Sequence, residues 1–133
     1  SPPAFNAPVK VAAVAESILE GLIAEEKNDI VTAINAYKDA VRQEDNLLYN
    51  EPRDWVHPAR QYLGDALTKA GRFREAETVF RDDLKINPNN PWSLTGLQTV
   101  LLLENKKNDG LAVQEKLREA LKRSDTKISN AVF

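Results

Sequence analysis

Apolar residues recur along most of this chain at the three-to-four-residue spacing of amphipathic helices. The spacing starts near Val9, and short polar or glycine-containing breaks divide it into pairs of helices. We expect Asp29 to cap the helix that follows the first break. In the second hairpin we expect Gly71 to adopt the left-handed backbone conformation in the turn between the two helices. The first helix is predicted to carry a wide apolar stripe, comprising Val14, Ile18, Leu19, Leu22 and Ile23. The pattern predicts an all-α protein made of helical hairpins.

The hairpins repeat with a period of about 34 residues, at about 14–47, 57–90 and 91–124. The clearest window runs from His57 to Asn90 and contains Leu63, Gly64, Leu67, Gly71, Ala76, Phe80 and Pro88. The first repeat matches it through Gly21, Ala24, Ala33, Tyr37 and Ala40. In the third, Asn90 is expected to cap a helix that starts at Pro91, and a longer turn is expected at 105–108. Residues 9–133 are therefore predicted to form one domain, with an extended lead-in at 1–8, an insertion at 48–56 and a C-terminal tail at 125–133.

These residues resemble the tetratricopeptide repeat (TPR) family, over about Val14 to Arg123. The resemblance implies a right-handed α-solenoid of three antiparallel hairpins, with the first helix of each pair lining a concave face. Family members are mostly scaffolds and adaptors that bind peptides or partner domains. A closer resemblance, to the C-terminal region of a group of bacterial repeat proteins without an established activity, rests on Tyr49 to Trp55, Pro58, Arg60, Asp83 and Trp92. It implies that the chain is the end of a longer protein.

Composition narrows the possible ligands. The net charge of −2 offers no basic field for nucleic acid, and no apolar run is long enough for membrane insertion. The absence of cysteine leaves the compartment open between cytoplasm and periplasm. The single histidine, His57, has no other ligands at metal-binding spacing, so we expect neither a metal nor a cofactor. No nucleophile–base pair or phosphate-binding loop is recognisable, so we do not expect an enzyme.

The resemblance places a set of exposed candidates for partner binding on the concave face: Tyr62, Asp65, Lys69, Trp92, Thr95 and Thr99. Tyr49 and Trp55 add two aromatic candidates in the insertion. Aromatic residues are enriched at binding hot spots, although packing in the core is the alternative role for Tyr62 and Trp92. The chaperone-tail clamp of some family members is not expected, because its basic and amide residues are replaced by Ile18, Leu22, Tyr62, Thr95 and Thr99.

Arg60 and Asp83 stand where the family has an aromatic and an alanine, on helices that would face each other. We expect them to form a partly buried structural ion pair. The function predicted from the whole sequence is a non-catalytic module that binds a protein or peptide of unknown identity. The alternative is a structural end cap or a self-associating segment, such as a homodimer, with no ligand of its own.

Overall fold

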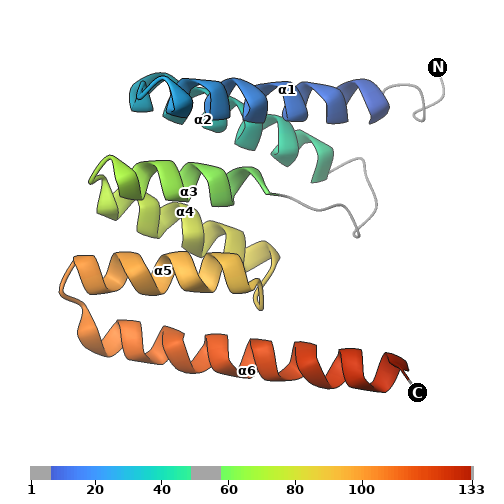
Figure 1. The fold of residues 1–133 in the computed structure, drawn as a ribbon, viewed down its shortest axis with the longest axis vertical. Coiled ribbons are helices and arrows are strands. Elements are labelled where there is room, and N and C mark those ends of the chain that lie inside the picture. Colours follow the sequence, from blue (N-terminus) through green and yellow to red (C-terminus); the bar gives the residue numbers. More distant parts are fainter. Residues whose placement is uncertain (1–6, 49–57, 133) are drawn as a thin grey trace. The chain divides into compact units, whose positions relative to one another are not determined.

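The structure is a computed structural model that describes residues 7–48 and 58–132, with side chains for residues 9–47 and 58–125. These residues form six α-helices and no strand (Figure 1), which confirms the prediction of an all-α protein. Their contacts divide the chain into two compact units, residues 1–70 and 71–133. The division falls inside the second predicted repeat, and the single-domain organisation stays a prediction.

The first unit contains α1 (Ala7–Glu26), α2 (Ile30–Leu48) and α3 (Ala59–Lys69). Helices α1 and α2 pack extensively against each other, and α3 packs on α2 and contacts α1 (Figure 1). Helix α1 starts two residues before the predicted Val9. One part of the core of this unit is a buried cluster made of Val14, Ala40, Leu47 and Ala59.

The buried side of α1 follows only part of its apolar stripe. Its inward line consists of Val14 and the small residues Ser17, Gly21 and Ala24, all buried, whereas Leu22 and Ile23 are exposed and Ile18 is only partly buried. The reason is the ring of Tyr37, which lies directly on the α1 backbone. A Cβ atom added at Gly21 would lie 2.2 Å from Cε1 of Tyr37. Large side chains are thus excluded from the line of closest approach, and Leu22 and Ile23 lie outside it.

Local signals explain where the helices begin and end. Asp29 accepts a hydrogen bond from the backbone N–H of Thr32 at 3.1 Å, which confirms it as the cap of α2. Gly71 has φ +76°, as predicted, and Asn28 and Asn105 provide the left-handed residues of the other two tight turns, with φ 59° and 62°. The helix boundaries therefore follow mostly from local chemistry.

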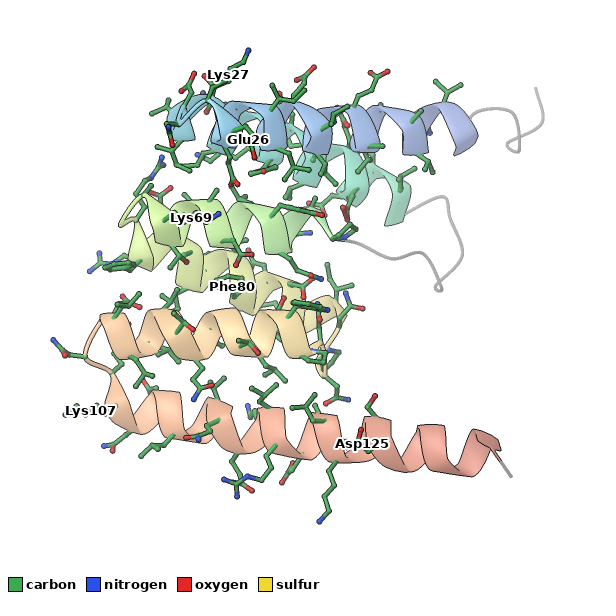
Figure 2. The ribbon with its side chains drawn as sticks, viewed as in Figure 1. Glu26, Lys27, Lys69, Phe80, Lys107 and Asp125 are labelled. Carbon is green, nitrogen blue, oxygen red and sulfur yellow. The ribbon has the colours of Figure 1, made fainter. Side chains whose placement is uncertain are left out.

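The second unit contains α4 (Phe73–Ile86), α5 (Pro91–Leu103) and α6 (Lys107–Val132). Helix α5 packs against both α4 and α6. Its start is capped as predicted, with the Asn90 side chain accepting from the Trp92 N–H at 3.1 Å. Buried side chains fill the unit, including Phe80 (labelled in Figure 2), Leu94, Leu97, Val100, Leu101 and Val113. Helix α6 starts at Lys107, so the longer turn predicted at 105–108 is wrong. The helix continues to Val132, through residues predicted as a tail.

Candidate binding site

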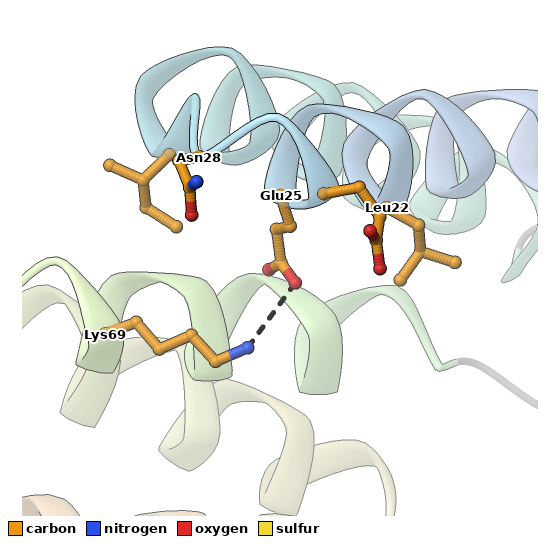
Figure 3. A pocket seen from close by; sticks show the side chains of 6 residues that line it. Leu22, Glu25, Asn28 and Lys69 are labelled. Atoms are coloured by element: carbon orange, nitrogen blue, oxygen red, sulfur yellow. Dashed lines mark hydrogen bonds and ion pairs between the residues drawn. The ribbon is translucent and has the colours of Figure 1, made fainter.

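The predicted α3 candidates lie along one face of the first unit. Tyr62, Asp65 and Lys69 follow each other at helical spacing and all reach the surface. The Nζ atom of Lys69 lies 3.4 Å from Oε2 of Glu25 on α1, which links the two helices (Figure 3). The structure therefore brings the α3 candidates together with residues near the end of α1.

A pocket of about 620 Å³ opens where α1 ends and α3 ends. This volume falls within the range of roughly 300–1,000 Å³ that is usual for ligand sites. Figure 3 shows side chains on its wall, and Glu26 and Lys69 are also labelled in Figure 2. The lining residues are Leu22, Glu25, Glu26, Asn28, Ile30 and Lys69. An apolar part, contributed by Leu22 and Ile30, thus lies beside charged groups of both signs.

Tyr62 combines the two roles that the sequence left open. Its ring stacks on the buried ring of Tyr37, with centroids 5.6 Å apart and planes 28° from parallel. Tyr62 nevertheless remains 36% exposed. The stack gives Tyr62 a fixed orientation, so it can serve as a rigid contact surface that loses little entropy on binding.

The hydroxyl of Tyr37 is a buried polar group beside this surface. Its oxygen is shielded from solvent. Burial, followed by the negative charge of Glu25, raises the pKa of Tyr37 above its usual value. Tyr37 is therefore neutral at physiological pH and adds a dipole, not a charge, to this region.

Asp65 carries an electrostatic strain at the same face. Reduced hydration raises the pKa of Asp65, Lys69 acts in the opposite direction, and the charge of Glu25 makes the smallest contribution, which again raises the pKa. The charge of Lys69 thus outweighs that of Glu25 but does not compensate the lost hydration of the Asp65 carboxylate. An added positive charge would be favourable here.

The candidates on α5 belong to the second unit. Trp92 is 73% exposed, which excludes the alternative that it packs in the core. Thr95 and Thr99 are exposed on the same helix, and their hydroxyls donate to the carbonyls of Pro91 and Thr95 at 2.7 and 3.0 Å. Leu102 and Leu103 are also exposed. The exposed surface of α5 therefore combines the Trp92 ring and two leucines with two threonines whose hydroxyl protons already have acceptors.

Arg60 and Asp83 have partners within their own units. The guanidinium of Arg60 donates two hydrogen bonds to the carboxylate of Asp45, at 2.7 and 2.9 Å. Asp83 is fully buried and accepts from the hydroxyl of Ser93 and from the amide of Asn90. Since the two residues belong to different units, the Arg60–Asp83 ion pair stays a prediction.

Glu44 is a structural residue that the sequence analysis missed. It is 1% exposed, and its Oε1 atom accepts from the backbone N–H of Ala59 at 2.7 Å. A carboxylate at this point satisfies a free N–H at the start of α3 and interacts favourably with the helix dipole. Its spacing could have indicated this role, because Glu44 lies four residues after Ala40 and three before Leu47, on the buried face of α2.

Three aromatic or titratable residues that the sequence analysis singled out cannot be compared with the structure. Tyr49, Trp55 and His57 fall outside the described residues. The described residues contain no group of three or more potential metal ligands, and none of their helices has the length and apolar character needed to cross a bilayer. Comparison of the sequence with models of known protein families and with curated proteins found no match. The resemblance to the TPR family therefore continues to rest on the motif residues.

Proposed function

We propose that this chain is a non-catalytic helical-repeat module that binds a segment of another protein on the exposed face of α1 and α3. The observation that carries the proposal is the pocket of about 620 Å³ at which Glu25 and Lys69 meet, beside the stacked ring of Tyr62. Apolar surface with a few charged groups and an aromatic anchor is the usual composition of a peptide-binding site. The TPR-like repeat pattern supports the same function, because such stacks use their first helices for binding.

The pocket suits a ligand with a basic side chain. Glu25 and Glu26 line it, Asp65 lies one helical turn before Lys69, and Lys69 is the one cation among its described lining residues. The raised pKa of Asp65 supports this choice, because an incoming cation would favour the ionised carboxylate. The proposed partner segment therefore contains lysine or arginine next to an apolar residue that can contact Leu22 and Tyr62.

The experiment is selection of peptides from a random displayed library on the purified chain, followed by fluorescence anisotropy with a labelled selected peptide. We expect Tyr62→Ala to weaken binding by about tenfold or more, as for an aromatic hot spot. Replacing the basic residue of the peptide with glutamine should have a similar effect. Circular dichroism verifies that the variant remains folded.

Leu121→Ala is the matched control, because Leu121 is an exposed apolar residue on α6. Its affinity for the selected peptide should equal that of the unmodified chain. The proposal is wrong if Tyr62→Ala binds the selected peptides as tightly as the control does, or if no peptide with a basic residue is enriched.

We propose the α5 face around Trp92 as a second contact region for the same partner. Trp92→Ala removes a large exposed aromatic side chain without opening the core, so loss of affinity reports binding directly. Unchanged affinity for a full partner protein would exclude this region while leaving the α1–α3 pocket in place.

The structural alternative has one observation in its favour. The exposed side of α6 carries many charged residues, among them Lys107, Asp109, Glu115, Arg118 and Lys122, together with the exposed Leu111 and Leu121. A polar outer helix is typical of the terminal repeat that caps a stack. Light scattering over a range of protein concentrations distinguishes the alternatives, since a concentration-dependent dimer supports self-association.

A further inference from the structure

The second unit contains a groove whose floor is apolar. Leu94 and Leu97 of α5 are 2% exposed and lie at its base, while Leu84 of α4 and Val113 of α6 lie on opposite sides. Among the described residues of this unit, helix packing joins α4 to α5 and α5 to α6 only. The space bordered by α4 and α6 is therefore open, and the groove encloses about 340 Å³.

Positive side chains line both sides of this groove. Arg81 and Lys85 come from α4 and Lys116 comes from α6, and none of its described lining residues is acidic. Glu77 contacts Arg81 at 2.8 Å and Asp82 contacts Lys85 at 3.3 Å, and neither carboxylate lines the groove. The Lys85–Asp82 pair is the more exposed of the two, and such a pair contributes at most about 1 kcal/mol, so Lys85 can change partner at little cost.

The arrangement favours a peptide over a fatty acid. A fatty acid presents one carboxylate at one end of its chain, whereas the cations here stand on the two opposite sides of an apolar strip. A peptide can place carboxylates on both sides of a line of apolar side chains. The volume lies at the lower end of the usual range of roughly 300–1,000 Å³ and suits one or two large side chains better than a whole small molecule.

We propose that this groove binds an acidic peptide segment whose bulky apolar side chains enter between α4 and α6. Its carboxylates pair with Arg81 and Lys85 on one side and with Lys116 on the other. The site shares no residue with the pocket of the first unit and takes a ligand of the opposite charge. It is thus a second recognition site, independent of the function proposed above.

The test uses a fluorescein-labelled synthetic peptide in which Leu and Phe recur every three to four residues among Asp and Glu. Two companion peptides replace the acidic residues with Lys or the apolar residues with Ser. Titration with the complete chain, followed by anisotropy, should show the acidic amphipathic peptide binding at least about tenfold more tightly than either companion. Its affinity should fall as salt is added, because the contacts are partly exposed.

Charge reversal at the groove is compared with a matched reversal elsewhere. Lys85→Glu combined with Lys116→Glu should weaken binding by at least about tenfold. Lys27→Glu combined with Lys107→Glu changes the net charge equally at two exposed positions that do not line the groove (labelled in Figure 2), and its affinity should stay within about twofold of the unmodified chain. Circular dichroism shows whether both variants are folded.

Three outcomes would overturn the proposal. Equal weakening by the two charge reversals would show that only net charge matters. Amide shifts on peptide addition that fall on α1 and α3, and not around Leu84 and Val113, would place binding in the other unit. Tight binding of decanoate together with no binding of the acidic peptide would identify the groove as a lipid site.

Discussion

Asp65 is an exposed carboxylate whose hydration is partly reduced by folding. Reduced hydration raises its pKa the most, Lys69 lowers it by a smaller amount, and Glu25 adds a still smaller increase. A carboxyl group with a raised pKa favours the folded state when protonated, and this contribution is lost as the pH rises through its folded pKa. We predict that Asp65→Asn raises the thermal unfolding midpoint at pH 7, and that the gain disappears below pH 3.8, the unperturbed value.

Thermal unfolding followed by circular dichroism at pH 7 and pH 3 measures the effect. Asp125→Asn, at an exposed position on α6 (Figure 2), is the control and should show no gain at either pH. A lower midpoint for Asp65→Asn at pH 7 would contradict the assigned electrostatic strain.

Glu44 acts at the junction of α2 and α3. Glu44→Ala would leave the N–H of Ala59 without its 2.7 Å acceptor in a buried position. Hydrogen bonds to charged groups contribute about 1.5–3 kcal/mol, so we predict a loss of that size in the free energy of unfolding. Urea denaturation measures it. Asp39→Ala, an exposed change on the same helix, should cost less than about 0.5 kcal/mol, and equal losses for the two variants would show that the buried contact contributes nothing.

At the scale of helices, two glycines set how closely neighbours approach. A Cβ atom at Gly21 would lie 2.2 Å from Tyr37, and one at Gly96 would lie 2.3 Å from Phe80. We predict that Gly21→Ala and Gly96→Ala each destabilise the fold by about 1–3 kcal/mol through overpacking, although alanine is the better helix former.

Gly110→Ala provides the matched control on α6. The nearest neighbour of its new Cβ atom is the end of the Leu102 side chain at 3.3 Å, which is exposed and able to move. We expect this variant to be neutral or more stable, because the gain in helix propensity is not opposed by a fixed ring. Chemical denaturation of the three variants tests this order, and an equal effect of all three would refute the packing argument.

A charge cluster joins α4 to the turn between α5 and α6. The two carboxylate oxygens of Glu77 each lie 2.8 Å from a cation, Oε1 from Nζ of Lys106 and Oε2 from Nε of Arg81. Hydrogen bonds from Lys106 and, to a smaller extent, from Arg81 lower the pKa of Glu77 to about 2. A depressed carboxyl pKa contributes stability that is present above the unfolded value of 4.5 and lost as the pH falls towards 2. The pKa of Glu104 is raised, first by burial and then by Glu77. This raised pKa changes stability with pH in the opposite direction, so it offsets part of the pH dependence that Glu77 causes.

We predict that Lys106→Gln reduces the stability of the second unit near pH 7 and flattens its decline between pH 4.5 and 2. Unfolding free energies at several pH values measure both effects. Lys107→Gln removes an adjacent exposed lysine and should retain the original profile. Coincident pH profiles for Lys106→Gln and the unmodified chain would contradict the role of this contact.

At the scale of the molecule, the repeat pattern predicts that the two units continue one rigid solenoid. The chain has no cysteine, so spin labels can be attached at Lys27→Cys and Lys107→Cys without other changes. We expect a distance distribution between them as narrow as that of a control pair within the second unit, Lys85→Cys and Lys107→Cys. A much broader distribution between units would contradict a single stack.

The local features of this protein were predictable from the sequence because each depends on a few neighbouring residues. Helix caps at Asp29 and Asn90 and the left-handed turn at Gly71 use chemistry within three or four positions. The exposure of Asp65 and Lys69 on α3 followed from the repeat frame for the same reason. The 3.4 Å contact of Lys69 with Glu25 was not predictable, because its two residues are 44 positions apart.

The sequence by itself therefore determined that the chain is all-helical, where most helices begin and end, and which α3 residues reach the surface. Only the tertiary structure decided which side of α1 is buried, that Glu44 caps α3, and that Arg60 pairs with Asp45. The physical reason is that periodicity records an apolar face only approximately, within a wide arc of the helix. The ring of Tyr37 against Gly21 selects one line within that arc, and such a contact exists only after the helices have packed.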